Sequence, residues 1–498
     1  MASYTAIAKA KDGSDIPFCD SHALHSSYNP LREAEQFAAQ FPEDASFFVI
    51  LGIAGGYHLE ALLRRYPSAR IIAIETDATT LAFLRAIPCV TQLQQNKQLV
   101  MGTVADCATL ITRLFRPAKH TTLQVAALRA WQQCFPTAYQ LASSSIQQAL
   151  QAISADFSVQ SHFGALWQRN SFVNLSRLTA APSYVRAVTV PKDKIAAIIA
   201  AGPSLDESIA QLQQHRERYY IIATDTAYTA LHKRALVADA VVSVDAQQIS
   251  HAHFFYTNAA TLFVFDITAN TAAVRTVAQK QLPFTFIETG HPIAQLAATY
   301  SGSRSFPHLE TGSGTVTIAA AAFAVQAGFT TLAFFGADFA YSNGKPYTAG
   351  SYLDDQFFSH GMRTKSAEQY FCAIMYRTKL VNLPPQQHID NARSTKSARF
   401  TTEVLQSYER TLQEFLQQHG FVKQGDCYKI ATNTANITSA AFSYDKFLQA
   451  YQALDAATAE IALLPYVAWL QKHRMQKSSF SETLCIARTQ TLVYTRTI

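Results

Sequence analysis

The sequence has few charged residues: they make up 15% of its 498 positions, against about 25% in most globular proteins. It also contains no internal repeat and no low-complexity tract, and 49% of its residues are hydrophobic. These features exclude a disordered or fibrous chain, because neither class has the composition that builds a packed core. A chain of this length is expected to form about two to four domains.

Signals for export and for disulfide bonding are also missing. The seven cysteines are widely scattered and include no C-x-x-C pair, which argues against a disulfide framework and against a zinc knuckle. Near the N-terminus, Lys9, Lys11 and Asp12 interrupt every apolar run, so no secretory signal is recognised. The sequence therefore predicts a cytoplasmic protein.

No run of lysine and arginine is present, and the formal net charge is only +6. A nucleic-acid-binding arm would need such a run, so we expect no nucleic-acid partner. The mild excess of positive charge suits an anionic small molecule.

One long segment, from Thr311 to Ala337, contains no charged residue. It is long enough to cross a bilayer, which takes about 20 residues. However, it is rich in alanine and threonine, it contains Gln326, and Gly328 separates it from a β-rich stretch at 330–335. The pattern predicts a helix of small residues that ends at a glycine, followed by a buried parallel strand, and not a membrane span.

The N-terminal region predicts a βαβ unit. An apolar run of strand length, 47–51, leads into a glycine-containing stretch, 52–56, and an amphipathic segment, 58–65; a second strand, 70–74, ends at Glu75. Rossmann-like folds use such a turn and a later acidic residue to hold the phosphates and ribose of a nucleotide. The glycines do not follow G-x-G-x-x-G, so a tight turn with close helix packing is the alternative, and both interpretations stay open.

Between 106 and 178 the apolar residues recur at helical spacing, which predicts helices with Trp131 in the core. Pro182 and Pro191 then bracket a linker or entry strand, where we place the main domain boundary. Beyond 383 the pattern becomes helical again.

The central region alternates strands with helices. Six stretches of strand length are predicted at 195–200, 219–223, 240–244, 262–265, 284–287 and 331–335. This alternation favours a doubly wound, mostly parallel sheet, whose ligands bind at the carboxyl ends of the strands. The predicted fold class is α/β, with a Rossmann-like N-terminal unit, a central doubly wound sheet and a helical C-terminal region. The corresponding domains are 1–180, 181–383 and 384–498.

A first candidate site lies where the strand at 195–200 turns into a helix, at Gly202, Pro203 and Ser204. Gly202 lets a ligand approach the backbone, Pro203 suits the first helical turn, and Ser204 offers a hydroxyl and an amide to a phosphate. A plain helix cap by Ser204 or Asp206 explains the same residues.

Polar residues also end the next two strands: Thr224 and Asp225 after the second, and Asp245 after the third. Carboxylates at such positions commonly accept hydrogen bonds from a ribose or a base. Ala246 and Gln247 follow Asp245, so the D-x-D pair of metal-dependent transferases is missing and the sequence requires no metal. Helix capping by Asp225 and a solvated turn at Asp245 are the alternatives.

The uncharged helix opens with Thr311, Gly312, Ser313 and Gly314, and Asp338 follows the strand after it. Glycines at a helix start let a phosphate approach the N-terminal amides. An aromatic loop suited to covering a sugar or a base comes next. Its tyrosines are Tyr341, Tyr347 and Tyr352.

Together these motifs resemble the motility accessory factor (Maf) family of flagellin glycosyltransferases. The resemblance rests on 202–205, Asp245, 311–314 and 336–342, and it extends over about 47–371. The same central motifs are similar to those of bacterial sialyltransferases, which use sugars activated by cytidine monophosphate (CMP). A related family of 6-hydroxymethylpterin diphosphokinases shares the Gly-Pro-Ser and Gly-x-Asp pattern. The central sheet is therefore expected to be sialyltransferase-like.

The resemblance implies an inverting, metal-independent protein O-glycosyltransferase. It would move a nonulosonic (sialic-acid-like) sugar from a CMP-activated donor to Ser or Thr of flagellin, as flagellar assembly and motility require. The donor is a substrate, and no cofactor is implied. The residues implied in donor-nucleotide binding are Gly202, Pro203, Ser204, Thr224, Asp225, Gly312, Ser313, Gly314 and Tyr341.

Such a transfer needs a base for the acceptor hydroxyl and neutralisation of the departing phosphate. Histidine suits the base role because its ordinary pKa is about 6.5. The sialyltransferases carry a histidine downstream of their Gly-x-Asp-Phe strand, and the nearest such residue here is His360. Asp338 and Asp245 are the alternatives for this catalytic role.

Two other functions fit the same motifs. A hydroxymethylpterin diphosphokinase would use them with a nucleoside triphosphate and magnesium, and a flagellin-binding chaperone would keep the folds without catalysis. The expected partners are flagellin and a nucleotide sugar, and a homo-oligomer is compatible with the sequence. The sugar, the modified hydroxyls and the role of the N-terminal glycine stretch are not identified by the sequence.

Overall fold

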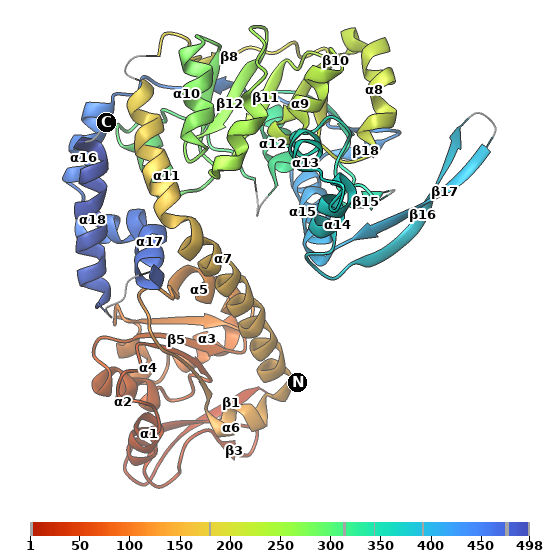
Figure 1. Cartoon of the computed structure of the whole chain (residues 1–498). Helices are drawn as coiled ribbons and strands as arrows, with labels where there is room; N and C mark the ends of the chain where they lie inside the picture. The colour runs from red at the N-terminus through yellow and green to blue at the C-terminus, as the bar shows by residue number, and fades with distance from the viewer. Residues whose placement is uncertain are drawn as a thin grey trace. The chain divides into compact units, whose positions relative to one another are not determined.

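The computed structural model describes residues 3–178, 181–311, 315–342, 344–390, 393–473 and 478–496 (Figure 1). By its contacts the chain divides into two compact units. Unit 1 comprises 1–164 and 465–483, and unit 2 comprises 165–464 and 484–498. Parallel sheets with helices between their strands, and helices near the C-terminus, confirm the predicted α/β fold class. The three-domain division stays a prediction.

Unit 1 contains a four-stranded parallel sheet in the order β6-β5-β4-β7. The central strand β4 (Phe47–Leu51) is apolar throughout, because alternate residues belong to two different buried clusters, one on each face. The glycine stretch follows, and α2 (Tyr57–Arg65) begins after Gly56. The other strands are β5 (Arg70–Glu75), β6 (Leu99–Thr103) and β7 (Leu123–Ala127). The remaining elements before β7 are β1 (Tyr4–Lys9), β2 (Asp15–Cys19), β3 (His22–Ala23), α1 (Pro30–Ala39), α3 (Ala78–Leu84), α4 (Pro88–Leu93) and α5 (Cys107–Leu114).

Strand β7 corrects the helical prediction for 106–178. It pairs in parallel with β4, although its residues were predicted to be helical. A spacing of four positions also fits a strand, where alternate residues share a face, and five residues are too few to separate the two periods. The rest of the segment is largely helical, with α6 (Arg129–Cys134) and the long α7 (Pro136–Arg177). Trp131 is fully buried in the core, as predicted.

Unit 2 is built on an eight-stranded sheet in the order β13-β12-β11-β10-β9-β14-β19-β18. The first six strands are parallel, and the chain steps outward from β9 to β13 before it returns to place β14 on the other side of β9. The strand order therefore reverses at β9 and β14, and such a reversal is where doubly wound sheets bind ligands. The parallel strands are β9 (Ile195–Ile199), β10 (Tyr219–Thr224), β11 (Ala240–Ser243), β12 (Leu262–Asp266), β13 (Phe284–Ile287) and β14 (Thr331–Phe335).

Helices connect these strands in turn. They are α8 (Leu205–Gln214) and α9 (Asp225–Lys233), then α10 (Thr271–Gln279), α11 (Pro292–Thr299) and α12 (Val316–Gln326), with the 3-10 helices η2 (Arg216–Arg218) and η3 (Gln248–Phe254). The boundaries agree with the predicted alternation to within a few residues.

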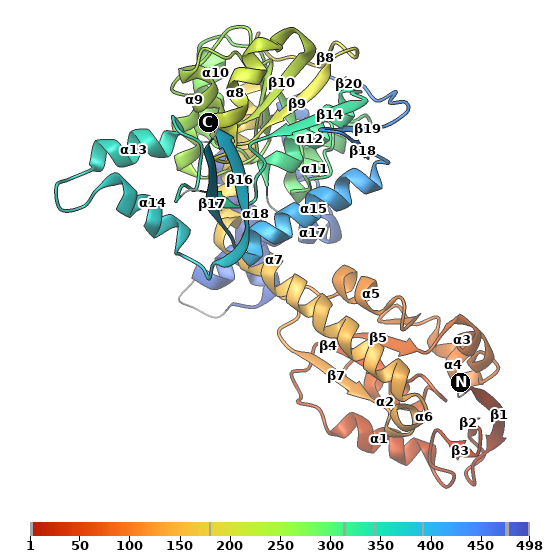
Figure 2. The ribbon, with the colours of Figure 1, turned by 90° about the vertical axis from the view of Figure 1, so that its right-hand side faces the viewer.

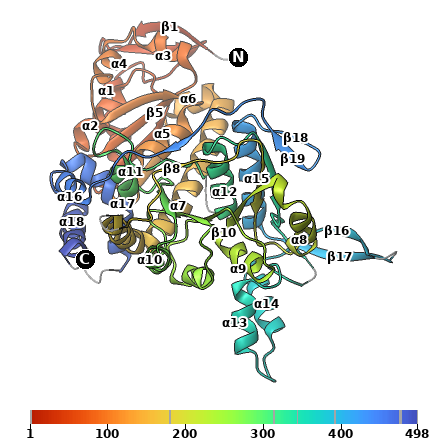
Figure 3. The same cartoon turned by 90° about the horizontal axis from the view of Figure 1, so that it is seen from above.

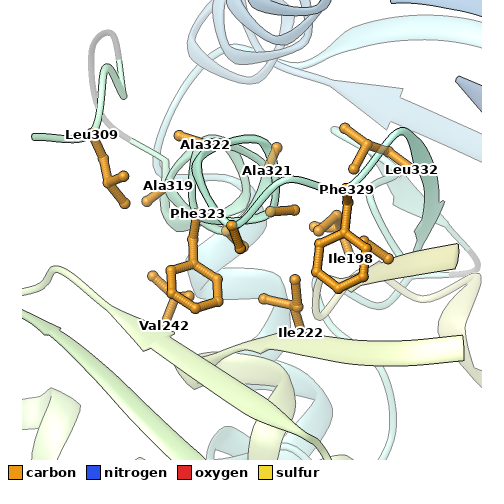
Figure 4. Close-up of a cluster of buried hydrophobic side chains, with 14 of the residues drawn as sticks. Ile198, Ile222, Val242, Leu309, Ala319, Ala321, Ala322, Phe323, Phe329 and Leu332 are labelled. Carbon is orange, nitrogen blue, oxygen red and sulfur yellow. The ribbon is translucent and has the colours of Figure 1, made fainter. Parts of the chain in front are cut away.

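Helix α12 packs against the middle of the sheet, as Figure 4 shows. Phe323 shares one buried cluster with Ile222 and Val242, and α12 is buried along 317–324 on every side. A helix surrounded by protein needs no polar face, which explains its lack of charge. The predicted core helix and the strand after it are thus present.

The apolar helices give no single membrane-spanning candidate. Within the described ranges no helix is by itself long and apolar enough to cross a bilayer, and only the bent pair α16 (Tyr444–Gln452) and α17 (Ala456–His473) passes that test when taken together.

The C-terminal region is mainly helical, as predicted, with α15 (Glu403–Gln418), α16, α17 and α18 (Phe480–Arg496). It also extends the central sheet through β19 (Cys427–Lys429), which pairs antiparallel with β14, and β18 (Val422–Gln424). A short strand, β20 (Ile437–Thr438), pairs with β8 (Ala187–Val188). Strands of two or three residues carry no readable periodicity, so the sequence did not predict them.

The segment after β14 leaves the sheet. It forms β15 (Tyr341–Ser342), then the helical pair α13 (Tyr352–His360) and α14 (Ala367–Met375), which extends away from the central sheet in Figures 2 and 3. The antiparallel ribbon of β16 (Val381–Asp390) and β17 (Arg393–Thr401) follows, and β17 pairs with β15. The helical pattern predicted beyond 383 therefore begins only with α15.

Candidate functional site

The turns after β9 and β14 are joined at the point where the strand order reverses. The Gly202 N–H donates to the Gly336 carbonyl at 2.8 Å. The Asp338 carboxylate accepts the Ser204 backbone N–H at 2.8 Å and also the Ser204 hydroxyl. A methyl group on Gly202 would lie only 2.6 Å from Asp338 Oδ2, so glycine is required by this close approach. The sequence-predicted residues of both turns thus form one hydrogen-bonded unit.

The start of α8 is occupied by internal hydrogen bonds. The Leu205 N–H donates to the Gly202 carbonyl at 3.1 Å, and the Asp206 N–H donates to the Pro203 carbonyl at 3.2 Å. The Ser204 hydroxyl is directed to Asp338 rather than to an amide of α8. The turn formed by Gly202, Pro203 and Ser204 therefore orients Asp338 through the hydrogen bonds of Ser204.

Asp206 connects the start of α8 to the aromatic loop. Its carboxylate forms an ion pair at 2.6 Å with Arg234, the residue that caps the C-terminus of α9, and it accepts the Thr348 hydroxyl and the Ala349 N–H, the latter at 3.1 Å. Arg234 in turn donates to the Ala349 carbonyl at 2.6 Å. The loop that carries Tyr347 is fixed by both a charge and a backbone contact.

The ends of β10 and β11 supply buried oxygens. Asp225 is 2% exposed and accepts the Thr226 N–H at 2.7 Å and the Ser243 hydroxyl at 2.6 Å. Thr224 beside it is buried as well. Asp245 is half-buried and accepts an N–H of its own turn at 2.9 Å. Asp225 is the first residue of α9, whose N-cap is Thr224, and Asp245 lies in the turn after β11, so the two carboxylates follow neighbouring strands at the same sheet edge.

Helix α7 fixes the turns after β11 and β12. The Asn170 amide donates to the carbonyls of Ala246 at 3.2 Å and Thr268 at 3.1 Å. Asn174, one helical turn later, donates to the carbonyls on both sides of Thr268, at 3.0 and 2.8 Å. Because these amides are buried, their loss would leave several carbonyls unpaired, and the edge beside Asp245 would lose its support.

Three tyrosines line the same edge from the loop side. Burial raises the pKa of Tyr341 and of Tyr347. It also raises the pKa of Tyr352, to about 12. The positive charge of Arg377 lowers the pKa of all three tyrosines. Arg377 itself is exposed, just after α14. An aromatic wall with a cation beside it suits a base or sugar linked to a phosphate.

A histidine that the sequence did not single out lies against this wall. His253 of η3 is 4% exposed, and its ring meets that of Tyr352 edge-on, with 4.4 Å between the ring centres. Burial lowers the pKa of His253, while the charges of Asp225 and Asp245 favour its protonated form. The sequence offered no signal for it, because η3 is an irregular connection without helical periodicity.

His360 is placed elsewhere. It is exposed at the last position of α13, whereas Tyr352 at the first position of that helix reaches the site. The two positions are about 12 Å apart along a helix with a 1.5 Å rise per residue. No contact described for His360 joins it to Asp338 or Asp245. The predicted residues Gly312, Ser313 and Gly314 lie outside the described residues.

The N-terminal glycine stretch was the other predicted nucleotide site. Here Glu75 is fully buried, and its two oxygens accept four hydrogen bonds. The donors are the Trp131 Nε1–H at 2.5 Å, the Thr76 N–H at 2.9 Å, the Tyr4 hydroxyl at 3.0 Å and the Ile53 N–H at 3.1 Å. Burial raises the pKa of Glu75, and these donors oppose that rise. The carboxylate that would bind a ribose is already saturated by the protein.

The amides of the glycine stretch are occupied too. The Gly52 N–H donates to the Ile74 carbonyl at 2.8 Å, the Gly56 N–H to the Ile53 carbonyl at 2.9 Å, and the Gly55 N–H to His25 Nε2 at 3.0 Å. Trp131 packs so closely on Gly52 that an added Cβ would lie 2.6 Å from the indole Cγ. The tight-turn interpretation of these glycines fits the geometry, and the indole lies where an approaching ligand would need room.

A metal centre is not apparent in the described part of the chain, where no group of three or more His, Cys, Asp or Glu side chains is placed to hold an ion.

Comparison with known proteins finds a family model, two relatives and a solved structure that parts or all of the chain resemble. A family model described as 6-hydroxymethylpterin diphosphokinase MptE-like matches residues 169–344. An uncharacterised protein of Treponema pallidum (strain Nichols) is 32% identical over 236 residues, which are 47% of this chain and 76% of the relative. Another from the same organism is 36% identical over 147 residues, 29% of this chain and 69% of the relative. The solved structure of a MAf glycosyltransferase from Magnetospirillum magneticum AMB-1 matches with a TM-score of 0.55 at 12% identity, over 99% of this chain and 87% of that chain.

The central part of the chain matches the MptE-like family model, and the fold of the chain is that of the MAf glycosyltransferase. The MptE-like match runs from α7 through β9 to β14, so it contains the hydrogen-bonded turns of Gly202, Ser204 and Asp338. The likeness to the solved glycosyltransferase shows a shared fold and confirms the predicted resemblance. The roles of single residues are argued from the geometry of the site.

Proposed function

We propose that this chain is a Maf-like protein O-glycosyltransferase that moves a nonulosonic sugar from a CMP-activated donor to Ser or Thr of flagellin in the cytoplasm, as flagellar assembly requires. The observation that carries the proposal is the convergence at one sheet edge of Asp338, Asp225 and the tyrosine wall, at the strand reversal of a glycosyltransferase fold. The transfer is proposed to be inverting and metal-independent, with flagellin and the nucleotide sugar as partners.

Each group has a role in this proposal. The tyrosines provide faces for the cytosine and the sugar, and the oxygens of Thr224 and Asp225 accept hydrogen bonds from the nucleoside. Arg377 is a cation whose charge acts on all three tyrosines, and it neutralises the charge that grows on the departing phosphate. Asp338, held by Ser204, offers a carboxylate of fixed orientation to the donor or to the acceptor hydroxyl.

The experiment is a transfer assay with mass detection. The purified chain is incubated with a CMP-linked nonulosonate and unmodified flagellin, and intact-mass spectrometry should show flagellin gaining one sugar mass per modified residue. A heat-inactivated sample and a flagellin without donor serve as controls. If several nonulosonate donors give no transfer although CMP binds, the proposal is wrong.

A second candidate, a 6-hydroxymethylpterin diphosphokinase, is favoured by the description of the family model that matches 169–344. Thermal shift separates the two functions, because a ligand at about 100 times its Kd stabilises by about 2.7 kcal/mol. Stabilisation by CMP in the presence of a chelator supports sugar transfer. Stabilisation only by adenosine triphosphate with magnesium supports the kinase.

A further inference from the structure

His253 is a buried histidine in contact with Tyr352 of the tyrosine wall. It is presented by η3, directly after the turn that carries Asp245, and η3 packs on α9, whose first residue is Asp225. Its ring is covered edge-on by Tyr352. Two carboxylates and an aromatic ring from three separate elements therefore face one imidazole.

The imidazole also has an unused nitrogen. Within the described residues, His253 Nδ1 is buried and has no hydrogen-bond partner. Buried polar atoms are nearly always paired, so an unpaired one beside a ligand site indicates a partner that arrives with the ligand. A neutral imidazole nitrogen accepts a hydrogen bond from a hydroxyl, and a sugar acceptor is a hydroxyl.

The charges around His253 suit proton uptake. Asp225 from α9 and Asp245 from the turn after β11 favour the protonated ring, and burial favours the neutral one. Tyr352 from α13 stays neutral because its pKa is about 12. On α10, which also packs on η3, the charge of Arg275 acts on His251, which contacts Thr276, rather than on His253. The ring is thus neutral at pH 7, and two carboxylates stabilise the charge it would gain.

Resting on the proposed function, we propose that His253, and not His360, is the general base that takes the proton of the acceptor hydroxyl. The acceptor O–H bond breaks and its proton moves to an imidazole nitrogen. The oxygen's electron pair forms a bond to the anomeric carbon of the sugar, while the bond from that carbon to the phosphate oxygen breaks. Its electron pair leaves with CMP, and the imidazolium of His253, facing Asp225 and Asp245, later gives its proton to solvent. Tyr352 has to move aside for the acceptor to reach the ring.

The test compares three histidine variants in the full chain: His253→Gln, His360→Gln and the matched control His251→Gln on the same η3. For each, sugar transfer at saturating donor, CMP affinity and melting temperature are measured. We expect His253→Gln to lower turnover by about 10²–10⁴-fold, the usual contribution of a general base, with CMP affinity kept. His251→Gln and His360→Gln should keep wild-type turnover.

The pH dependence of turnover distinguishes loss of a general base from misfolding of the His253→Gln variant. In the wild type, turnover should fall on the acid side as His253 becomes protonated. Asp245→Asn removes a charge that favours protonation, so this acid limb should move to lower pH, a shift that a structural role would not produce. An acid limb that stays in place overturns the assignment. So does near-wild-type turnover of His253→Gln, or a loss confined to His360→Gln.

The two levels of inference fail in different ways. A wild-type chain that transfers no sugar overturns the proposed function, and the base assignment falls with it. An active wild type whose His253→Gln variant is equally active overturns the base assignment alone.

Discussion

A single methyl group at Gly202 tests how closely the turns after β9 and β14 must fit. In Gly202→Ala the new Cβ would lie 2.6 Å from Asp338 Oδ2 and closer still to the Gly336 carbonyl oxygen, whereas real Cβ contacts stay beyond 3.0 Å. The carboxylate would have to retreat by about 0.4 Å or more, the difference between these two distances. It cannot simply rotate away, because Ser204 holds both of its oxygens.

The expected cost follows from overpacking, which destabilises by about 1–3 kcal/mol. With an unfolding entropy of about 2.1 cal/mol/K per residue, this corresponds in unit 2 to a fall in melting temperature of roughly 1.5–5 °C. CMP affinity should fall as well, because Asp338 and the start of α8 are displaced together. Differential scanning fluorimetry with and without CMP measures both effects on the same sample.

Two other glycines separate crowding from backbone strain. Gly344 has a φ of +71° but open space around its Cβ position, so Gly344→Ala should cost only the left-handed penalty of about 1–2 kcal/mol. Gly336 has a φ of +66°, and its Cβ would meet the Ala200 carbonyl oxygen, so Gly336→Ala should be the most destabilising. CMP binding should survive only in Gly344→Ala. Unchanged melting and CMP affinity in Gly202→Ala would refute the close-fit argument.

Three further predictions concern other parts of the chain. Isothermal titration should give one CMP per chain, because the amides of the glycine stretch are already bonded; a second site in unit 1 would contradict this. Arg377→Gln should weaken CMP binding about tenfold, or about 1.4 kcal/mol. The control Arg363→Gln, at an exposed position between α13 and α14, should leave CMP affinity unchanged. Equal CMP affinities of the two variants would exclude Arg377 as the phosphate partner. Burial lowers the pKa of His291 to about 3 in the folded chain, against an ordinary pKa of about 6.5 in the unfolded chain. Between these two values the unfolded chain binds more protons than the folded chain. The free energy of unfolding therefore falls as pH drops from about 6.5 to about 3, by up to about 1.4 kcal/mol per pH unit. His291→Phe should therefore flatten the decrease in unfolding free energy between pH 7 and pH 5 in urea titrations, and an unaltered decrease would rule out this origin.

The central strands could be predicted because burial on both faces leaves a continuous apolar run. Strand β14 was predicted with its observed ends and helix α12 was predicted before it, since Gly328 separates the two segments. Strand β7 was missed because its five residues fit either period, and β19 because three residues carry no period at all. The length of a strand therefore limits its prediction from periodicity more than its composition does.

The candidate site was predictable wherever topology alone decides position. Asp225, Asp245 and Asp338 each follow a parallel strand, so a parallel sheet brings them to one edge whatever the loops do. His253 and Arg377 were not predictable, because they come from an irregular helix and from the chain after α14, and only tertiary packing brings them to that edge. His360 has the residue type expected of a base, but it is exposed at the end of α13 opposite to Tyr352.

The saturated carboxylate of Glu75 has a consequence for how unit 1 responds to its surroundings. A fold that binds a free ligand gains stability with the logarithm of ligand concentration, so it weakens when the ligand is scarce. In unit 1 the Trp131 side chain and the Tyr4 hydroxyl donate to Glu75 in place of a ligand. Because both residues belong to the same chain as Glu75, these donors are always present. The stability of unit 1 is therefore expected to be independent of the nucleotide pool, whereas that of unit 2 should rise and fall with it.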